Sequence, residues 1–256
     1  MKPSQIAAQL YTVREHCKTA TDLAATARKL RAIGYAAVQV SAVGPIPEQE
    51  IAAIMRGEGL VICATHEPGA TLLHEPQKVI DRLGLLGCDF TAYPYPQGVD
   101  LTDRAQIAEL ARQLNASGER LRKAGLTLGY HNHAIEFVKV DGVTALDYLY
   151  THAESENLAA ELDTYWVHFG GGDVVEWCYR LRGRLPAIHL KDYMFTKENR
   201  PTYCEIGAGT LPFAKIIREA EAGGCRWFIV EQDTCPGDPF DSLRISYDHI
   251  RANYVS

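Results

Sequence analysis

The sequence predicts a closed (β/α)₈ barrel, in which eight parallel strands alternate with helices in one domain, residues 1–256. Two observations carry this prediction. An amphipathic segment, a glycine and a short apolar run recur along the chain, and strand-like runs number eight in 256 residues. A glycine directly after a helix can adopt the left-handed conformation that ends it. A run of consecutive apolar residues is typical of a parallel strand covered on both faces.

The expected elements follow one another in order. In the first helical segment Leu23, Ala27 and Leu30 share one face before Gly34, and the same spacing recurs before two later glycines. A last helix is expected over residues 239–254. The strands are expected near residues 6–11, 36–41, 60–65, 88–93, 126–131, 158–163, 185–191 and 226–231.

Two connections bear on the architecture. Residues 12–16, after the first strand, contain no glycine, whereas the open, doubly wound sheet that is the alternative fold often carries a glycine-rich turn there. The connection 192–210 exceeds the usual ~2–6 residues. Because it leaves the carboxyl end of a strand, we expect it to form a lid over the active face.

The composition excludes several classes of protein. A content of 46% hydrophobic and 23% charged residues is that of an ordinary globular protein. A net charge of −6 argues against a nucleic-acid partner, and no apolar run approaches the ~20 residues of a membrane helix. The N-terminus lacks the apolar core of a signal peptide, and the seven cysteines are scattered, without a Cys-x-x-Cys pair. We therefore expect a cytoplasmic protein with no membrane partner, and a homo-oligomer is compatible with the sequence.

Polar residues gather where the strands end, which is where barrels of this class place their active sites. Charge is concentrated after the last four strands, where Asp163, His189 and Glu231 stand. Each has a structural explanation on its own: a helix cap, a satisfied core histidine and an ion pair, respectively. Carboxylates brought to one rim would repel one another, so a bound divalent cation explains the set better.

Six segments then resemble a known family. The chain is similar to the sugar phosphate isomerase/epimerase group of xylose isomerase-like TIM barrels, a superfamily that includes endonuclease IV, tagatose epimerase and inosose dehydratase. The resemblance covers nearly the whole chain. It rests on residues 9–14, 130–137, 162–166, 189–192, 207–213 and 230–233.

The resemblance implies an enzyme of carbohydrate metabolism. We expect an isomerase or epimerase of a sugar, keto-sugar or sugar phosphate that works through an enediolate. The alternative at the same site is a dehydratase or lyase of an oxidised sugar or inosose. A DNA-repair enzyme is disfavoured by the negative charge, and a non-catalytic binding barrel by donors on four consecutive strand ends.

The resemblance also implies one divalent ion, with Mn²⁺ as first choice and Mg²⁺, Co²⁺ or Zn²⁺ as alternatives. Relatives hold it with Glu, Asp, His and Glu from strands five to eight, and the last three correspond to Asp163, His189 and Glu231. Strand five ends in His131 where relatives have glutamate, so Glu136 is the expected first ligand and His131 the alternative. Gln39 likewise stands where relatives commonly have glutamate. The expected catalytic residues are His131, His133, Lys191 and Glu231, and the expected substrate-binding residues are Gln9, Tyr11, His66, Tyr93 and Trp166.

Overall fold

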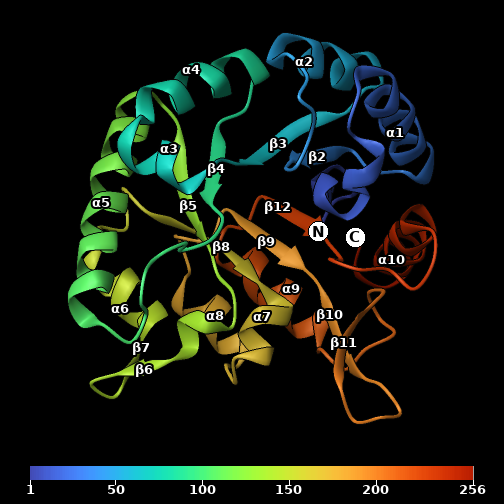
Figure 1. The fold of residues 1–256 in the computed structure, drawn as a ribbon. Coiled ribbons are helices and arrows are strands. Elements are labelled where there is room, and N and C mark those ends of the chain that lie inside the picture. The colour runs from blue at the N-terminus through green and yellow to red at the C-terminus, as the bar shows by residue number, and fades with distance from the viewer. Residues whose placement is uncertain (256) are drawn as a thin grey trace.

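The computed structural model describes residues 1–255 and contains a closed barrel of eight parallel strands (Figure 1). The barrel strands are β1 (Ile6–Gln9), β2 (Ala37–Val40), β3 (Val61–His66), β4 (Phe90–Tyr93), β5 (Thr127–His131), β8 (Ala159–Asp163), β9 (Ala187–Leu190) and β12 (Trp227–Val230). Each pairs with the next barrel strand along the chain, and β1 pairs with both β2 and β12. The predicted fold class is confirmed, and the strand bounds differ from the predicted ones by at most two residues.

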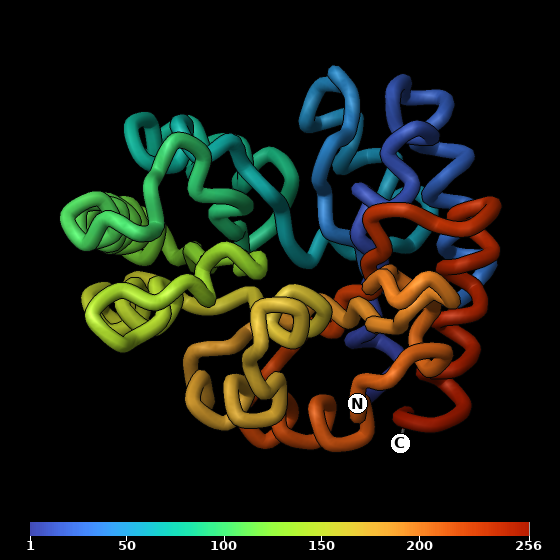
Figure 2. The backbone as a smooth tube through the Cα atoms, turned by 60° about the horizontal axis from the view of Figure 1, so that its bottom comes forward, coloured from blue at the N-terminus to red at the C-terminus, as the bar shows by residue number. Residues whose placement is uncertain are grey.

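Helices surround the barrel, as Figure 1 shows. They are α1 (Ala20–Ile33), α2 (Glu48–Gly57), α3 (Gly69–His74), α4 (Pro76–Leu86), α5 (Arg104–Lys123), α6 (Ala145–His152), α7 (Thr164–Phe169), α8 (Val174–Arg180), α9 (Phe213–Ala222) and α10 (Pro239–Tyr254), with short 3₁₀ segments at Pro3–Gln5, Leu10–His16 and Ile135–Phe137. The bounds of α10 are those predicted for the last helix. In Figure 2, α1 and α10 lie side by side, with the Lys29 ammonium 4.2 Å from the ring centre of Phe240. No helix within residues 1–255 combines the length and apolar character needed to cross a bilayer.

Glycines separate helices from strands as the sequence pattern predicts. Positive φ angles occur at the five glycines of that pattern: Gly34, Gly59, Gly87, Gly125 and Gly224. At Gly34, with φ 127°, a Cβ would also lie 2.5 Å from the ring of Tyr247 on α10. This position therefore needs glycine both for its backbone conformation and for the close approach of α10.

Two hairpins lie outside the barrel and were not expected from the sequence. β6 (Lys139–Val140) pairs with β7 (Val143–Thr144), and β10 (Asp192–Phe195) pairs with β11 (Pro201–Cys204). The β10–β11 hairpin occupies the segment expected as a lid. Asp192 ties this segment together, because its Oδ2 accepts hydrogen bonds from the backbone N–H groups of Gly207 (2.9 Å) and Gly209 (3.0 Å).

Alternation along the strands decides which side chains face the barrel interior. Small inward-facing residues pack in one apolar cluster, which includes Ala7, Ala37, Ala159 and Ala187. Two residues further along the same four strands stand Gln9, Gln39, Glu161 and His189, all fully buried. Residues of the opposite face, such as Tyr130 and Leu162, belong to the core between strands and helices. The interior thus becomes polar toward the carboxyl ends of the strands.

Candidate metal centre

Four donor side chains from consecutive strands converge at the carboxyl end of the barrel. His131 ends β5, Asp163 ends β8, His189 lies on β9 and Glu231 directly follows β12. One ligand atom of each lies within 4.8 Å of the others, and all four residues are buried. We call these four residues the rim group. They meet because parallel strands bring their carboxyl ends to one rim.

The two oxygens of Asp163 have separate partners. Oδ1 accepts a hydrogen bond from the backbone N–H of Trp166 at 3.0 Å and so caps α7. Oδ2 lies 3.9 Å from Nε2 of His131 and 3.9 Å from Nδ1 of His189. Oδ2 also lies 3.0 Å from the Lys191 ammonium, although within residues 1–255 no contact of this buried oxygen has hydrogen-bond geometry. Burial raises the pKa of Asp163 to about 6, even though the Lys191 ammonium stabilises the charged form. The helix-cap interpretation is therefore correct for one oxygen and leaves the other aimed at the rim group.

Lys191 supplies a buried positive charge beside the rim group. Its Nζ lies 2.7 Å from Glu231, 3.0 Å from Asp163 and 3.1 Å from Asp233. Burial alone would lower the pKa of this ammonium, but the Asp163 and Glu231 carboxylates raise it well above its usual value. Lys191 is therefore charged at neutral pH.

His189 is held between carboxylates on both sides of its ring. Its Nδ1 lies 2.9 Å from Glu231, and its Nε2 lies 2.6 Å from Oε1 of Gln39 and 3.4 Å from Glu161. Burial alone would lower its pKa, but Glu161 and Glu231 raise the pKa to about 10. The core-histidine interpretation is too simple, because the ring pairs with charged groups at both nitrogens.

The chemistry of the rim group fits a divalent ion. Two carboxylates and two imidazoles are a donor set used by Mn²⁺, Zn²⁺ and related ions. Oδ2 of Asp163 faces both rings at 3.9 Å and is the oxygen that such an ion would use, beside the Lys191 ammonium at 3.0 Å. A cation there would add to the positive charge of Lys191, which already lies between the Asp163 and Glu231 carboxylates.

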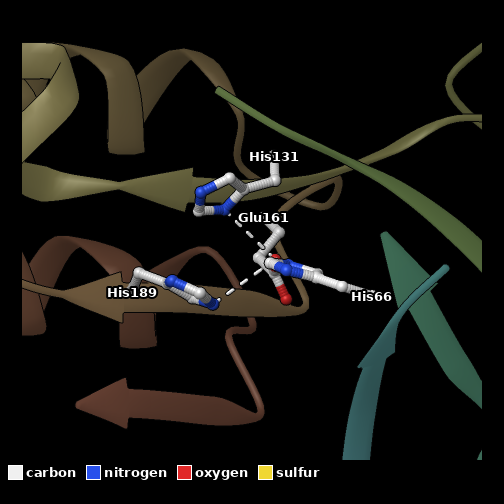
Figure 3. A group of neighbouring side chains, drawn as sticks. All are labelled: His66, His131, Glu161 and His189. Atoms are coloured by element: carbon white, nitrogen blue, oxygen red, sulfur yellow. Dashed lines mark hydrogen bonds and ion pairs between the residues drawn. The ribbon is translucent and has the colours of Figure 1, made fainter. Parts of the chain in front are cut away.

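Glu161 was missed by the sequence analysis and lies directly beneath the rim group. Its carboxylate, fully buried, is approached by three ring nitrogens: His66 Nε2 at 2.6 Å, His131 Nδ1 at 3.2 Å and His189 Nε2 at 3.4 Å. Figure 3 shows the three rings pointing at this carboxylate from three sides. The signal was present in the alternation of β8, because Glu161 stands two residues before Asp163 and so shares its face.

A cavity of about 250 Å³ opens above the rim group. Of the expected site residues, Tyr11, His66, His131, His133, Lys191 and Glu231 line it. Ser41, Pro94, Tyr95 and Asp233 also line it. The ring of His133 lies 5.2 Å from that of Tyr95, and its buried Nδ1 has no partner among the described residues.

Three expected substrate-binding residues are placed differently. Tyr93 follows Ala92 on β4 and so faces outward, where its ring stacks on Tyr130 with centroids 5.8 Å apart. Gln9 faces inward but is buried below the cavity, where its Nε2 donates to Gln39 at 2.9 Å. Trp166 packs on His133, with ring centroids 5.3 Å apart, and is not among the lining residues. Neither Tyr93 nor Gln9 lines the cavity.

Glu136 is not brought to the rim group, so the first expected ligand is corrected. Its carboxylate accepts hydrogen bonds from the Tyr130 hydroxyl and from the backbone N–H of His133, each at 2.8 Å. Because Tyr130 belongs to the outward face of β5, Glu136 lies on the helix side of the barrel wall. The alternative, His131, is the residue of this segment that joins the rim group.

The buried Glu136 carboxyl predicts a measurable pH effect on stability. Burial raises the pKa of Glu136 to about 7 in the folded protein, from an ordinary value of 4.5. Between these two pH values the carboxyl is protonated in the folded protein and ionised in the unfolded chain. This contribution to the free energy of unfolding is therefore lost as the pH rises from about 4.5 to 7, up to roughly 3 kcal/mol. Glu136→Gln should gain that amount relative to wild type between pH 5 and pH 8 in urea unfolding of chelator-treated protein. A difference that does not change with pH would contradict this role.

Comparison with known proteins places the chain in a family. The family model for the xylose isomerase-like TIM barrel matches residues 27–252. The chain belongs to this family. No curated protein sequence matched the barrel.

Solved structures of similar fold carry several activities in their names. A sugar phosphate isomerase/epimerase from Parabacteroides distasonis shares 20% identity, with TM-score 0.84 over 97% of this chain and 94% of that one. A probable 3-DHS dehydratase from Bacillus anthracis shares 13% identity, with TM-score 0.73 over 99% and 100%. A xylose isomerase-like TIM barrel protein from Mycobacterium smegmatis, in complex with magnesium, shares 14% identity, with TM-score 0.73 over 98% and 97%. At these identities the likeness is one of fold.

Proposed function

We propose that this protein is a divalent-metal-dependent isomerase or epimerase of a sugar or keto-sugar that works through an enediolate. The position of the rim group supports the proposal: two carboxylates and two imidazoles adjoin a cavity whose wall also carries His133 and Lys191. The names of similar folds, which include an isomerase/epimerase, agree with this reaction class.

His131, Asp163, His189 and Glu231 would hold the ion, with manganese as first choice and magnesium, cobalt or zinc as alternatives. When bound there, the ion supplies a Lewis acid that polarises a substrate carbonyl. The chain's own task is then to remove and return a proton at the carbon beside that carbonyl.

His133 is the proposed base for this proton. Burial and the neighbouring His131 lower its pKa to about 2, so its ring is neutral at pH 7. To serve as a base it would need its protonated form stabilised, and the Glu231 carboxylate acts in that direction. Its Nδ1 has no partner among the described residues, and the side chain lines the cavity. The charged Lys191 ammonium would stabilise the oxygen on which negative charge develops.

The charges of the cavity wall favour a sugar without a phosphate group. Among the described lining residues Lys191 is the one Lys or Arg, and it already contacts three carboxylates. Phosphate recognition typically uses arginine forks or several free donors, which this wall lacks within residues 1–255. We therefore place uncharged sugars ahead of sugar phosphates. The free, mostly buried cysteines support a location in a reducing cytoplasm.

Deuterium exchange tests the reaction class. Manganese-loaded and chelator-treated protein is incubated with a panel of sugars, keto-sugars, sugar phosphates and inososes in D₂O, and the products are followed by NMR. We expect deuterium beside the carbonyl of at least one panel member with loaded protein and none with treated protein. An isomer as product supports the proposal, whereas loss of water from the substrate would replace it by the dehydratase alternative. Binding without exchange would reject an enolising enzyme.

A further inference from the structure

A chain of buried amides lies behind His189, and its hydrogen bonds run in one direction. The backbone N–H of Tyr11 can only donate, and it points at Oε1 of Gln9 at 3.3 Å. The amide nitrogen of Gln9 therefore faces Oε1 of Gln39 at 2.9 Å. The amide nitrogen of Gln39 in turn donates to Oε1 of Glu161 at 2.7 Å. Each oxygen and nitrogen is thus assigned from a fixed backbone donor.

This chain fixes the proton on His189. Oε1 of Gln39 is an acceptor, and Nε2 of His189 lies 2.6 Å from it. Nε2 must therefore carry the proton. The other nitrogen, Nδ1, faces Glu231 and Asp163 of the rim group. Without an ion, Nδ1 also carries a proton, because it lies 2.9 Å from the Glu231 carboxylate, which can only accept. A bound ion would take the place of the Nδ1 proton, since Gln39 holds the proton on Nε2.

His131 is held the opposite way round. Its Nδ1 lies 3.2 Å from Oε2 of Glu161, in ion-pair contact but short of hydrogen-bond geometry, and has no other partner among the described residues. A carboxylate can only accept, so the proton belongs on Nδ1. Nε2 then faces Oδ2 of Asp163 at 3.9 Å with its lone pair free.

We propose that Glu161, with Gln39 and Gln9 behind it, is a positioning residue that fixes His131 and His189 in opposite tautomers, leaving Nε2 of His131 and Nδ1 of His189 for the divalent ion. Histidine ligands commonly donate their second ring N–H to a carboxylate or carbonyl. Here the acceptor is the Glu161 carboxylate for His131 and the amide oxygen of Gln39, which Glu161 orients, for His189. The inference rests on the proposed metal site. In this proposal Gln9 and Gln39, which lie outside the cavity, help to decide which ring nitrogen of His189 is free to bind the ion.

Glu161→Gln is the direct test. The carboxylate accepts from Gln39 with one oxygen and faces the ring nitrogens with the other, whereas an amide has only one oxygen. If its NH₂ faces the rings, Nδ1 of His131 must accept, and the His131 proton moves to the nitrogen that faces the ion. If its NH₂ faces Gln39 instead, it meets the NH₂ group of Gln39, and neither donor has an acceptor. Binding of Zn²⁺ and Mn²⁺ is measured by titration calorimetry, and ring protonation by two-bond ¹H–¹⁵N NMR of zinc-loaded and metal-free protein. We expect one ion per chain in both proteins, bound about 10–100-fold more weakly by the variant.

Thr91→Val is the matched control. The Thr91 hydroxyl is buried in the same barrel and bonds Thr65 but no histidine. This variant should lower the melting temperature while leaving ion affinity and ring signals unchanged. Gln39→Met, which removes the acceptor for His189, should weaken ion binding as Glu161→Gln does.

Wild-type protein alone also tests the inference, should Glu161→Gln fail to fold. With zinc bound, the proton should be found on Nδ1 of His131 and on Nε2 of His189. The reverse tautomer in either ring, or unchanged ion affinity in Glu161→Gln, would overturn it. So would an anomalous-scattering peak between Glu161 and His66, since Glu161 would then be a ligand. These readouts do not depend on turnover, so a failure to enolise any sugar would reject the proposed function and leave the tautomer result standing.

Discussion

Asp163→Asn and Glu231→Gln are expected to lose most of their bound divalent ion while remaining folded. Asparagine caps helices about as well as aspartate, so α7 keeps the hydrogen bond that Oδ1 makes with Trp166. What is lost is one anionic donor from a group that has two carboxylates. We expect affinity to fall by more than the ~100-fold typical of residues behind a ligand. Metal analysis after gel filtration in Mn²⁺, with calorimetric titration, measures the effect.

Glu136→Gln is the matched control for this loss. Glu136 is also a fully buried carboxylate, but it lies on the helix side of the barrel wall. It should keep its full ion content. Full occupancy in both rim-group variants would reject the assignment, and loss in Glu136→Gln would restore Glu136 as a ligand.

His133→Gln and Lys191→Met should lose turnover while keeping the ion. Neither residue belongs to the rim group, yet both line the cavity. General acid–base groups typically contribute about 10²–10⁴-fold to turnover, so kcat should fall within that range. For Lys191→Met we further expect ion affinity to hold or rise, because the ammonium no longer competes for Asp163 and Glu231.

A purely structural role for these two residues predicts a different pattern. A packed histidine or an ion-paired lysine would, when replaced, lower the melting temperature and leave kcat per folded molecule near wild type. Measuring kcat, ion content and melting temperature on the same preparations separates the two roles. Unchanged kcat in both variants, on a substrate that wild type enolises, would remove them from the proton path.

The fold was predictable because its signals are local. Helix periodicity, the glycines after helices and the apolar runs each depend on a few neighbouring residues, and Pro239–Tyr254 was predicted to the residue. Asp163, His189 and Glu231 were predictable as a set for the same reason, since the end of each strand could be located.

The misplaced residues depend on which face of a strand is turned inward. Tyr93 lies on the outward face of β4, and a shift of one residue along a strand is enough to move a side chain from one face to the other. Glu161 was hidden in a run that reads as apolar, and its three histidine partners come from three other strands. Glu136 lies in the turn after β5. This turn folds back so that Glu136 meets the Tyr130 hydroxyl, and residue spacing alone does not predict the conformation of such a turn.

The barrel separates the residues proposed to hold the ion from those that shape the cavity, which has a consequence for engineering. The rim group and Glu161 sit on or beside strands and share one hydrogen-bond network, so a change at one is felt by the others. Ser41, Pro94 and Tyr95 follow strand ends, line the cavity and have no bond to that network. If the proposed function holds, saturation libraries confined to these three positions should alter which sugar is accepted while leaving the rim group and Glu161 in place.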